Sequence, residues 1–185
     1  MRTFVAVFPP PEVREALFRA ARELPSSKDF RLVDLEKIHL TLKFLGDVAE
    51  NELYRVRQAL EQIRERHEPF GVSTSGFGAF PSARNSRILW AGVEEGSGRL
   101  RAVAKDIEAL LQPAGFGRDA RAYVPHLTLG RTRGRRTKLD YTGIRPPVLS
   151  FTVSGVELVE SAPGKNGVNY TILATYPFQG SRSAP

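Results

Sequence analysis

The 185-residue sequence predicts an α+β fold, bilobal, with two pseudo-symmetric lobes of antiparallel sheet plus helices around a central cleft. Apolar residues alternate along several short segments and recur every three to four residues along three longer ones, so strands and helices are interspersed. The order strand, helix, strand, helix, strand pair is followed by helix, strand, strand pair, which is an imperfect duplication. The tetrapeptide HLTL occurs at residues 39–42 and again at 126–129, once in each half.

The first half begins with a buried strand and an amphipathic helix. RTFVAVF, residues 2–8, is apolar on both of its alternating faces. In PPPEVREALFRAAREL, Pro11 suits the first helical turn, and the apolar residues after it form one stripe. The other elements predicted here are extended segments at 30–34 and 38–46, a helix at 50–67, and strands at 70–80 and 87–93.

The second half repeats this pattern and ends in a strand pair. Its predicted elements are a helix at 98–113 and strands at 121–131, 148–161 and 167–178, the last two joined by the turn APGKNG. Without a flexible linker between the halves, we expect residues 1–178 to form a single bilobal domain with one continuous core. We expect the tail, residues 179–185, to be disordered.

The composition indicates the class of protein, the cellular location and the kind of partner to expect. The chain is 41% hydrophobic and 25% charged, and no apolar run approaches the ~18–20 residues that cross a bilayer. Cysteine is missing, which excludes disulfides and thiolate metal sites and makes a cytoplasmic location the expectation. The net charge of +7 favours a polyanionic partner such as nucleic acid, although the arginine excess of a GC-rich genome would explain that charge as well.

Each HLTL segment offers an imidazole and a hydroxyl on one face of a strand. Because side chains alternate, His39 and Thr41 point one way and the two leucines of the motif point the other. His126 and Thr128 behave alike in the second copy. If the two strands face each other across a pseudo-dyad, the cleft holds two histidines and two threonines.

This set of groups suits the chemistry of phosphate esters. Imidazole has an ordinary pKa of about 6.5, so one histidine can accept a proton from water while the other donates one to the departing oxygen. Threonine hydroxyls can hydrogen-bond the non-bridging oxygens as charge develops. Neither motif carries the additional nearby carboxylate or histidine of a metal site, and there is no G-x-S-x-G elbow. We therefore expect no metal and no cofactor.

A single HLTL segment is most often an ordinary amphipathic strand. Two identical copies at matching places in a duplicated pattern, using two of only three histidines, indicate a functional pair. The third histidine, His67, follows a predicted helix, where it favours the negative helix end.

Several segments together resemble the 2H phosphoesterase superfamily and, within it, the RNA 2′,3′-cyclic phosphodiesterase branch, also called the LigT or ThpR family of 2′-5′ RNA ligases. The two HLTL segments match the paired H-x-[ST]-x motifs of the superfamily. The resemblance extends from residue 1 to about 178 through MRTFVAVFPP, KIHLTLKFLGDV, GFGAFPSARNSRILWAGV, YVPHLTLGR and LVESAPGKNGVNYTIL.

The resemblance implies a metal-independent hydrolase that opens RNA 2′,3′-cyclic phosphate ends to 2′-phosphomonoesters, with 2′-5′ ligation as the reverse type of reaction. It implies a cleft between two lobes of one chain, and we expect a monomer that acts on RNA and not on membranes. Of the motif residues, His39 is assigned as proton donor and His126 as proton acceptor, with Thr41 and Thr128 beside them. The sequence does not distinguish this assignment from the reverse one.

Three further residues are candidates for substrate binding. Arg131 matches an arginine that commonly follows the second motif in the family, yet alternation points it away from the cleft unless the strand bends, for example at Gly130. Lys43 continues the two-residue step of the first motif, so it either lines the cleft rim or is a solvated strand end. Tyr123 either stacks on a terminal base or packs at a strand end.

The basic stretch after the second motif either holds the RNA backbone or is a soluble loop; it contains Arg131, Arg133, Arg135, Arg136 and Lys138. Where relatives often have tryptophan before the first motif, this chain has Arg31, which either replaces a stacking contact or is simply solvated. Phe77 and Phe80 are interpreted as core or lobe contacts. Two other functions stay open: a cyclic phosphodiesterase for small nucleotides such as ADP-ribose 1″,2″-cyclic phosphate, and a non-catalytic RNA-end binding protein.

Overall fold

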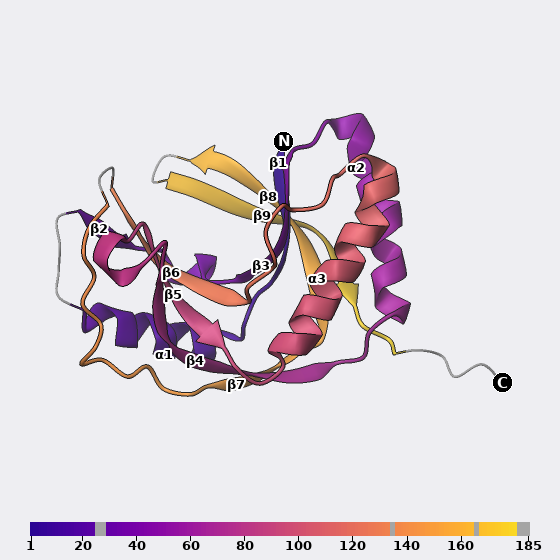
Figure 1. The fold of residues 1–185 in the computed structure, drawn as a ribbon. Helices are drawn as coiled ribbons and strands as arrows, with labels where there is room; N and C mark the ends of the chain where they lie inside the picture. Colours follow the sequence, from indigo (N-terminus) through magenta and orange to yellow (C-terminus); the bar gives the residue numbers. More distant parts are fainter. Residues whose placement is uncertain (25–28, 134–135, 165–166, 181–185) are drawn as a thin grey trace.

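The structure, a computed structural model, describes residues 1–24, 29–133, 136–164 and 167–180. Its α-helices are α1 (Pro11–Arg22), α2 (Glu50–Glu61) and α3 (Ser97–Leu111). Its strands are β1 (Arg2–Val7), β2 (Phe30–Leu32), β3 (Leu40–Asp47), β4 (Phe70–Phe80), β5 (Ile88–Val93), β6 (His126–Thr132), β7 (Ser150–Val153), β8 (Gly155–Gly164) and β9 (Gly167–Pro177) (Figure 1). The predicted α+β class is confirmed.

The strands form one antiparallel sheet whose middle pair carries the two HLTL segments. The order is β7-β4-β5-β6-β3-β1-β8-β9, with the short β2 added to β6. Where β3 meets β6, Leu40 pairs with Leu127. Equivalent leucines of the two motifs therefore lie opposite each other, as a pseudo-two-fold axis between them requires. The sheet continues from β6 to β5 on one side of this pair and from β3 to β1 on the other.

The two halves exchange strands, which the order of elements in the sequence does not reveal. β4 and β5 follow the first motif in the sequence, but β5 pairs with β6 of the second motif and β4 lies beyond β5. β8 and β9 end the chain, and β8 pairs with β1 of the first half. The predicted single strand at 148–161 is wrong because it breaks at Ser154. On one side of the break β7 pairs with β4, and on the other β8 pairs with β1, in opposite halves of the sheet.

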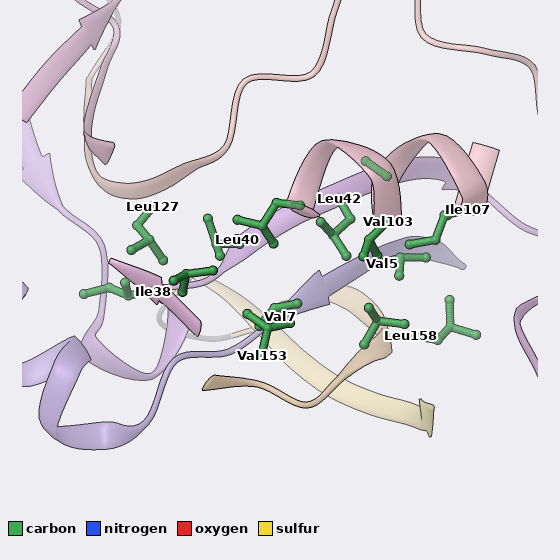
Figure 2. Packing of buried hydrophobic residues seen from close by; sticks show 14 of the residues in the cluster. Val5, Val7, Ile38, Leu40, Leu42, Val103, Ile107, Leu127, Val153 and Leu158 are labelled. Atoms are coloured by element: carbon green, nitrogen blue, oxygen red, sulfur yellow. The ribbon is translucent and has the colours of Figure 1, made fainter. Parts of the chain in front are cut away.

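The motif leucines lie in the main core, as predicted. Leu40, Leu127 and Leu129 are fully buried and Leu42 nearly so. They share one hydrophobic cluster with residues of both halves, and Figure 2 shows Leu40 beside Leu127 and Leu42 near Val103. α1 contacts β2 and β6, while α3 contacts β3 and α2, so helices cover the leucine face. Each leucine buried in this way stabilises the fold by about 1.5–3 kcal/mol and leaves the opposite strand face available for polar groups.

Two predicted boundaries need correction. The strand expected at 121–131 begins only at His126, because Pro125 has no N–H to donate to a neighbouring strand. Of the tail at 179–185, residues 181–185 lie outside the described part of the chain. Gln179 and Gly180 are held by hydrogen bonds from their backbone N–H groups to the carbonyls of Arg64 and His67. The turn predicted at APGKNG includes residues 165–166, which also lie outside the described part.

Candidate active site

The four motif side chains line two cavities on the face of the sheet opposite the leucines. The first cavity, of about 620 Å³, is lined by Thr41 and His126 among others. The second, of about 340 Å³, is lined by His39 and Thr128. Each cavity thus combines the histidine of one motif with the threonine of the other, as the pairing of Leu40 with Leu127 requires. A hydrogen bond of 2.9 Å between Thr41 Oγ1 and His39 Nε2 connects the two cavities.

Both histidines are oriented by the same type of backbone hydrogen bond. Nδ1 of His39 lies 2.7 Å from the carbonyl oxygen of Lys37, and Nδ1 of His126 lies 2.7 Å from that of Val124. A carbonyl oxygen only accepts, so each Nδ1 carries the hydrogen and each Nε2 is the working atom of the neutral imidazole. Nε2 of His39 accepts from the Thr41 hydroxyl, whereas Nε2 of His126 has no hydrogen-bond partner among the described residues.

Aromatic side chains surround the two imidazoles. Ring centroids of Phe4, Phe8 and Tyr170 lie 5.0, 5.3 and 5.4 Å from that of His39. The rings of Phe80 and Trp90 lie 5.1 and 6.3 Å from the ring of His126. Phe80 also lines the first cavity, so its interpretation as a core or lobe contact is incomplete.

This apolar environment lowers the pKa of both histidines. Burial is the main cause and brings the pKa of His39 to about 4; the bond to the Lys37 carbonyl opposes the shift, and the charge of Arg131 adds to it. Burial likewise lowers the pKa of His126, against its own backbone hydrogen bond. Near neutral pH, the free protein therefore holds two neutral imidazoles, each with a lone pair on Nε2.

Arg131 lies on the histidine face because β6 contains a bulge. Thr128 pairs with Trp90 and Gly130 with the adjacent Leu89, so β6 has one extra residue, Leu129, at this point. The alternation shifts by one residue, and Arg131 lines the second cavity. The irregularity that Arg131 needs in order to face the cleft lies at Leu129, next to Gly130. A Cβ atom on this glycine would lie 2.1 Å from Cζ of Phe30, so the close approach of β2 requires glycine here.

A bulge in β3 buries Lys43, which lines the first cavity but is not a solvated strand end. Thr41 pairs with Ala6 and Lys43 with Val5, which leaves Leu42 as the extra residue. The Lys43 side chain is therefore not a solvated rim group: the residue is 3% exposed. Its Nζ lies 3.1 Å from carboxylate oxygens of both Glu108 and Asp119. It also donates a hydrogen bond of 2.8 Å to the carbonyl of Gly117. Lys43 thus forms part of the cavity wall, and its charge is already balanced by the two carboxylates.

Tyr123 lies in the wall of the first cavity and also packs on the main core. Burial raises the pKa of its phenol, whose oxygen has no hydrogen-bond partner among the described residues.

Of the basic candidates, Arg31 and Arg133 line the second cavity beside Arg131. Arg135 lies outside the described residues, and Arg136 and Lys138 line neither cavity.

Phe44 is one of the site residues that the sequence pattern does not indicate. Phe44 is 59% exposed and lines the first cavity. Strict alternation from His39 and Thr41 would turn Phe44 toward the leucine face, and the bulge at Leu42 turns it back.

Within the described residues, no helix is long and apolar enough to span a membrane. These residues also contain no cluster of three or more histidine, aspartate or glutamate side chains that could hold a metal ion.

The profile of the family described as "LigT like Phosphoesterase" matches residues 7–90 and 92–170.

Relatives match over nearly the whole chain. A protein of Aquifex aeolicus named RNA 2′,3′-cyclic phosphodiesterase is 31% identical over 97% of this chain and 98% of its own. One of that name from Methanothermobacter thermautotrophicus is 35% identical over 95% and 98%. The crystal structure of a Thermus thermophilus protein has a TM-score of 0.83 at 29% identity, covering 98% of this chain and all of that one. Apo LigT of E. coli shares the fold, with a TM-score of 0.79 at 24% identity and 96% of both chains covered.

Proposed function

We propose that this chain, which belongs to the LigT-like phosphoesterase family, hydrolyses RNA 2′,3′-cyclic phosphate ends to 2′-phosphomonoesters. The names of the relatives support a cyclic phosphodiesterase acting on RNA. The observation that carries the proposal is the arrangement of the two motifs. Two neutral imidazoles line adjoining cavities, each together with the threonine of the other motif, and their Nδ1 atoms are engaged by backbone carbonyls, which leaves Nε2 for the chemistry.

The proposed reaction moves one proton at each side of the phosphorus. Nε2 of His126, free of other partners among the described residues, accepts a proton from water as the water oxygen bonds to phosphorus. On the opposite side the P–O3′ bond breaks, and Nε2 of His39 gives its proton to O3′. The product carries a 2′-phosphate, and the pair returns to its starting state after one proton passes back through solvent. Replacing water with a 5′-hydroxyl gives 2′-5′ ligation by the same steps.

Substrate binding supplies the charge that makes His39 an acid. With a pKa of about 4, His39 is neutral in the free protein near neutral pH. A phosphodiester anion beside Nε2 favours the imidazolium and raises this pKa. Once protonated, Nε2 no longer accepts from Thr41, and the hydroxyl 2.9 Å away is released to donate to a phosphate oxygen. Protonation of the acid and assembly of the hydrogen bonds to phosphate are thereby coupled.

The second cavity suits the anionic RNA strand. Its lining includes the cations Arg31, Lys37, Arg131 and Arg133 and one carboxylate among the described residues, Asp34. The Arg131 guanidinium presents several N–H donors to the phosphate oxygens next to Thr128. The remaining cations lie where the preceding phosphates of the strand would run, so binding should weaken as salt is added.

Single histidine variants test the proposal. With an oligoribonucleotide that ends in a 2′,3′-cyclic phosphate, His39→Ala and His126→Ala should each lose at least about 10²-fold in kcat, the usual contribution of a positioned acid or base. His67→Gln is the matched control, because His67 pairs with Asp106 at 2.9 Å and lines neither cavity. Activity of either alanine variant close to that of the control would refute the proposed roles. Turnover that requires an added divalent metal would also contradict them.

A further inference from the structure

The pseudo-two-fold axis makes Phe44 the structural counterpart of Arg131. Each is the third residue after its motif threonine, and each follows a bulge of one leucine, Leu42 in β3 and Leu129 in β6. The same backbone device therefore turns a guanidinium into the second cavity and a phenyl ring into the first. The two cavities therefore have equivalent positions in the backbone, but one carries a cationic side chain and the other an apolar aromatic one.

The first cavity is far larger than its proposed content. In the hydrolysis described above it receives the attacking water on the His126 side, and one water occupies about 30 Å³. The cavity holds about 620 Å³. Its apolar lining is continuous with the main core at Leu42 and is exposed at Phe44 and Val124, which are 59% and 48% accessible. Exposed apolar side chains at the mouth of a cavity mark a place where a ligand is bound.

We propose that the first cavity binds a nucleoside whose 5′-hydroxyl takes the place of the attacking water, with its base stacked on Phe44. This inference rests on the proposed function, because it uses His126 as the proton acceptor. The 5′-oxygen bonds to phosphorus, its proton passes to Nε2 of His126, the P–O3′ bond breaks, and His39 protonates O3′. The product is a 2′-5′ phosphodiester, and no further reactant is needed.

The surroundings of Phe44 favour an uncharged aromatic ligand over an anionic strand. Phe4 lies beside Phe44, with ring centroids 6.1 Å apart, and leaves most of the phenyl surface to solvent. Of the two cations in the lining, Lys43 is balanced by Glu108 and Asp119, and Arg121 is the other. A nucleobase has a π-face for stacking whatever its sequence, whereas a chain of phosphates finds its cations in the second cavity. Phe44 is thus a specificity-determining residue that favours an alcohol over water.

The test measures how cyclic phosphate is divided between joining and hydrolysis. The full chain is incubated with a cyclic-phosphate oligoribonucleotide and increasing amounts of a 5′-hydroxyl oligoribonucleotide, and both products are quantified in one reaction. Phe44→Ala should lower the ratio of 2′-5′ joined to hydrolysed product about tenfold, a loss typical of removing one stacked base. Phe44→Tyr should restore it. Tyr54→Ala, which removes an exposed aromatic ring of α2 that lines neither cavity, should leave the ratio unchanged.

Other outcomes overturn the inference. An unchanged ratio in Phe44→Ala would do so, and so would a rise in KM for the cyclic-phosphate strand at a constant ratio, which would place the base of that strand on Phe44. Hydrolysis by the wild-type protein without joined product at any acceptor concentration would exclude the nucleoside site and leave the proposed function standing. A protein that consumes no cyclic phosphate at all would, by contrast, refute the proposed function itself.

A binding measurement gives a readout independent of turnover. Trp90, the only tryptophan of the chain, lies beside Phe80 and His126, and both of these neighbours line the first cavity. Adenosine carries a free 5′-hydroxyl and no phosphate, so its titration should change Trp90 fluorescence in the wild-type protein. The dissociation constant should rise about tenfold in Phe44→Ala. An equal dissociation constant for both proteins would contradict the stacking role.

Discussion

The burial of His39 predicts a specific dependence of stability on pH. Burial lowers the pKa of His39 from 6.5 to about 4 in the native state, whereas the unfolded chain regains a value near 6.5. Below pH 6.5 the unfolded state therefore binds a proton that the native state rejects, and stability falls as pH falls. Since a pKa difference of one pH unit corresponds to about 1.4 kcal/mol, the free energy of unfolding that is lost because of this residue should reach about 3 kcal/mol at pH 4.

The variant His39→Gln isolates this contribution. Glutamine keeps a side-chain amide near the Lys37 carbonyl and Thr41 but does not titrate. The carboxylates and the other histidines contribute equally to the pH dependence of the free energy of unfolding in both proteins. Urea unfolding of each protein from pH 7.5 to pH 4 gives the free energy of unfolding. Wild type should lose about 3 kcal/mol more than His39→Gln over this range. Parallel curves would refute the reasoning that burial suppresses the charge of His39.

Further predictions concern the groups around the cleft. Lys43→Met should lower the free energy of unfolding by about 2 kcal/mol, less than a fully buried pair loses because Glu108 and Asp119 are partly hydrated, and a change below about 0.5 kcal/mol in urea unfolding would contradict its supporting role. Gly130→Ala should cost about 1–3 kcal/mol by collision with the Phe30 ring, and a double-mutant cycle with Phe30→Ala should recover part of it; strict additivity of the two losses would reject the collision. Arg131→Gln should lower kcat/KM for the cyclic-phosphate oligoribonucleotide about 10- to 100-fold and flatten its salt dependence, and a loss below about threefold would remove Arg131 from the site.

Local alternation was enough to predict which side of each motif strand is buried. Leu40 and Leu127 have no polar atoms to satisfy and pack on helices, so the direction of His39 and His126 follows from the period of a strand. Amphipathic stripes predicted the helices equally well, because the stripe on α1 matches its buried residues.

The sequence alone could not predict whether each motif strand contains a bulge, because a bulge depends on how two strands fit together. Gly130 indicated that β6 can bend, but nothing in the letters around Leu42 marks an extra residue. Each bulge shifts the alternation of the residues that follow it, and in β3 a second bulge at Leu45 shifts it back. That single effect accounts for the burial of Lys43, the place of Arg131 in the second cavity and the omission of Phe44. The break at Ser154, where the chain passes from β7 in one half of the sheet to β8 in the other, likewise depends on tertiary packing. The alternating sequence alone does not show with which half of the sheet each part pairs.

The chemistry proposed for the two histidines is tested most directly by the identity of one product. An oligoribonucleotide ending in a 2′,3′-cyclic phosphate is incubated with the wild-type protein and EDTA, and the new end is assigned as a 2′- or 3′-phosphate by phosphorus NMR. Protonation of O3′ by His39 with attack on the His126 side should yield the 2′-phosphomonoester only. A 3′-phosphate, or an untouched cyclic end, would contradict the proposed arrangement of donor and acceptor.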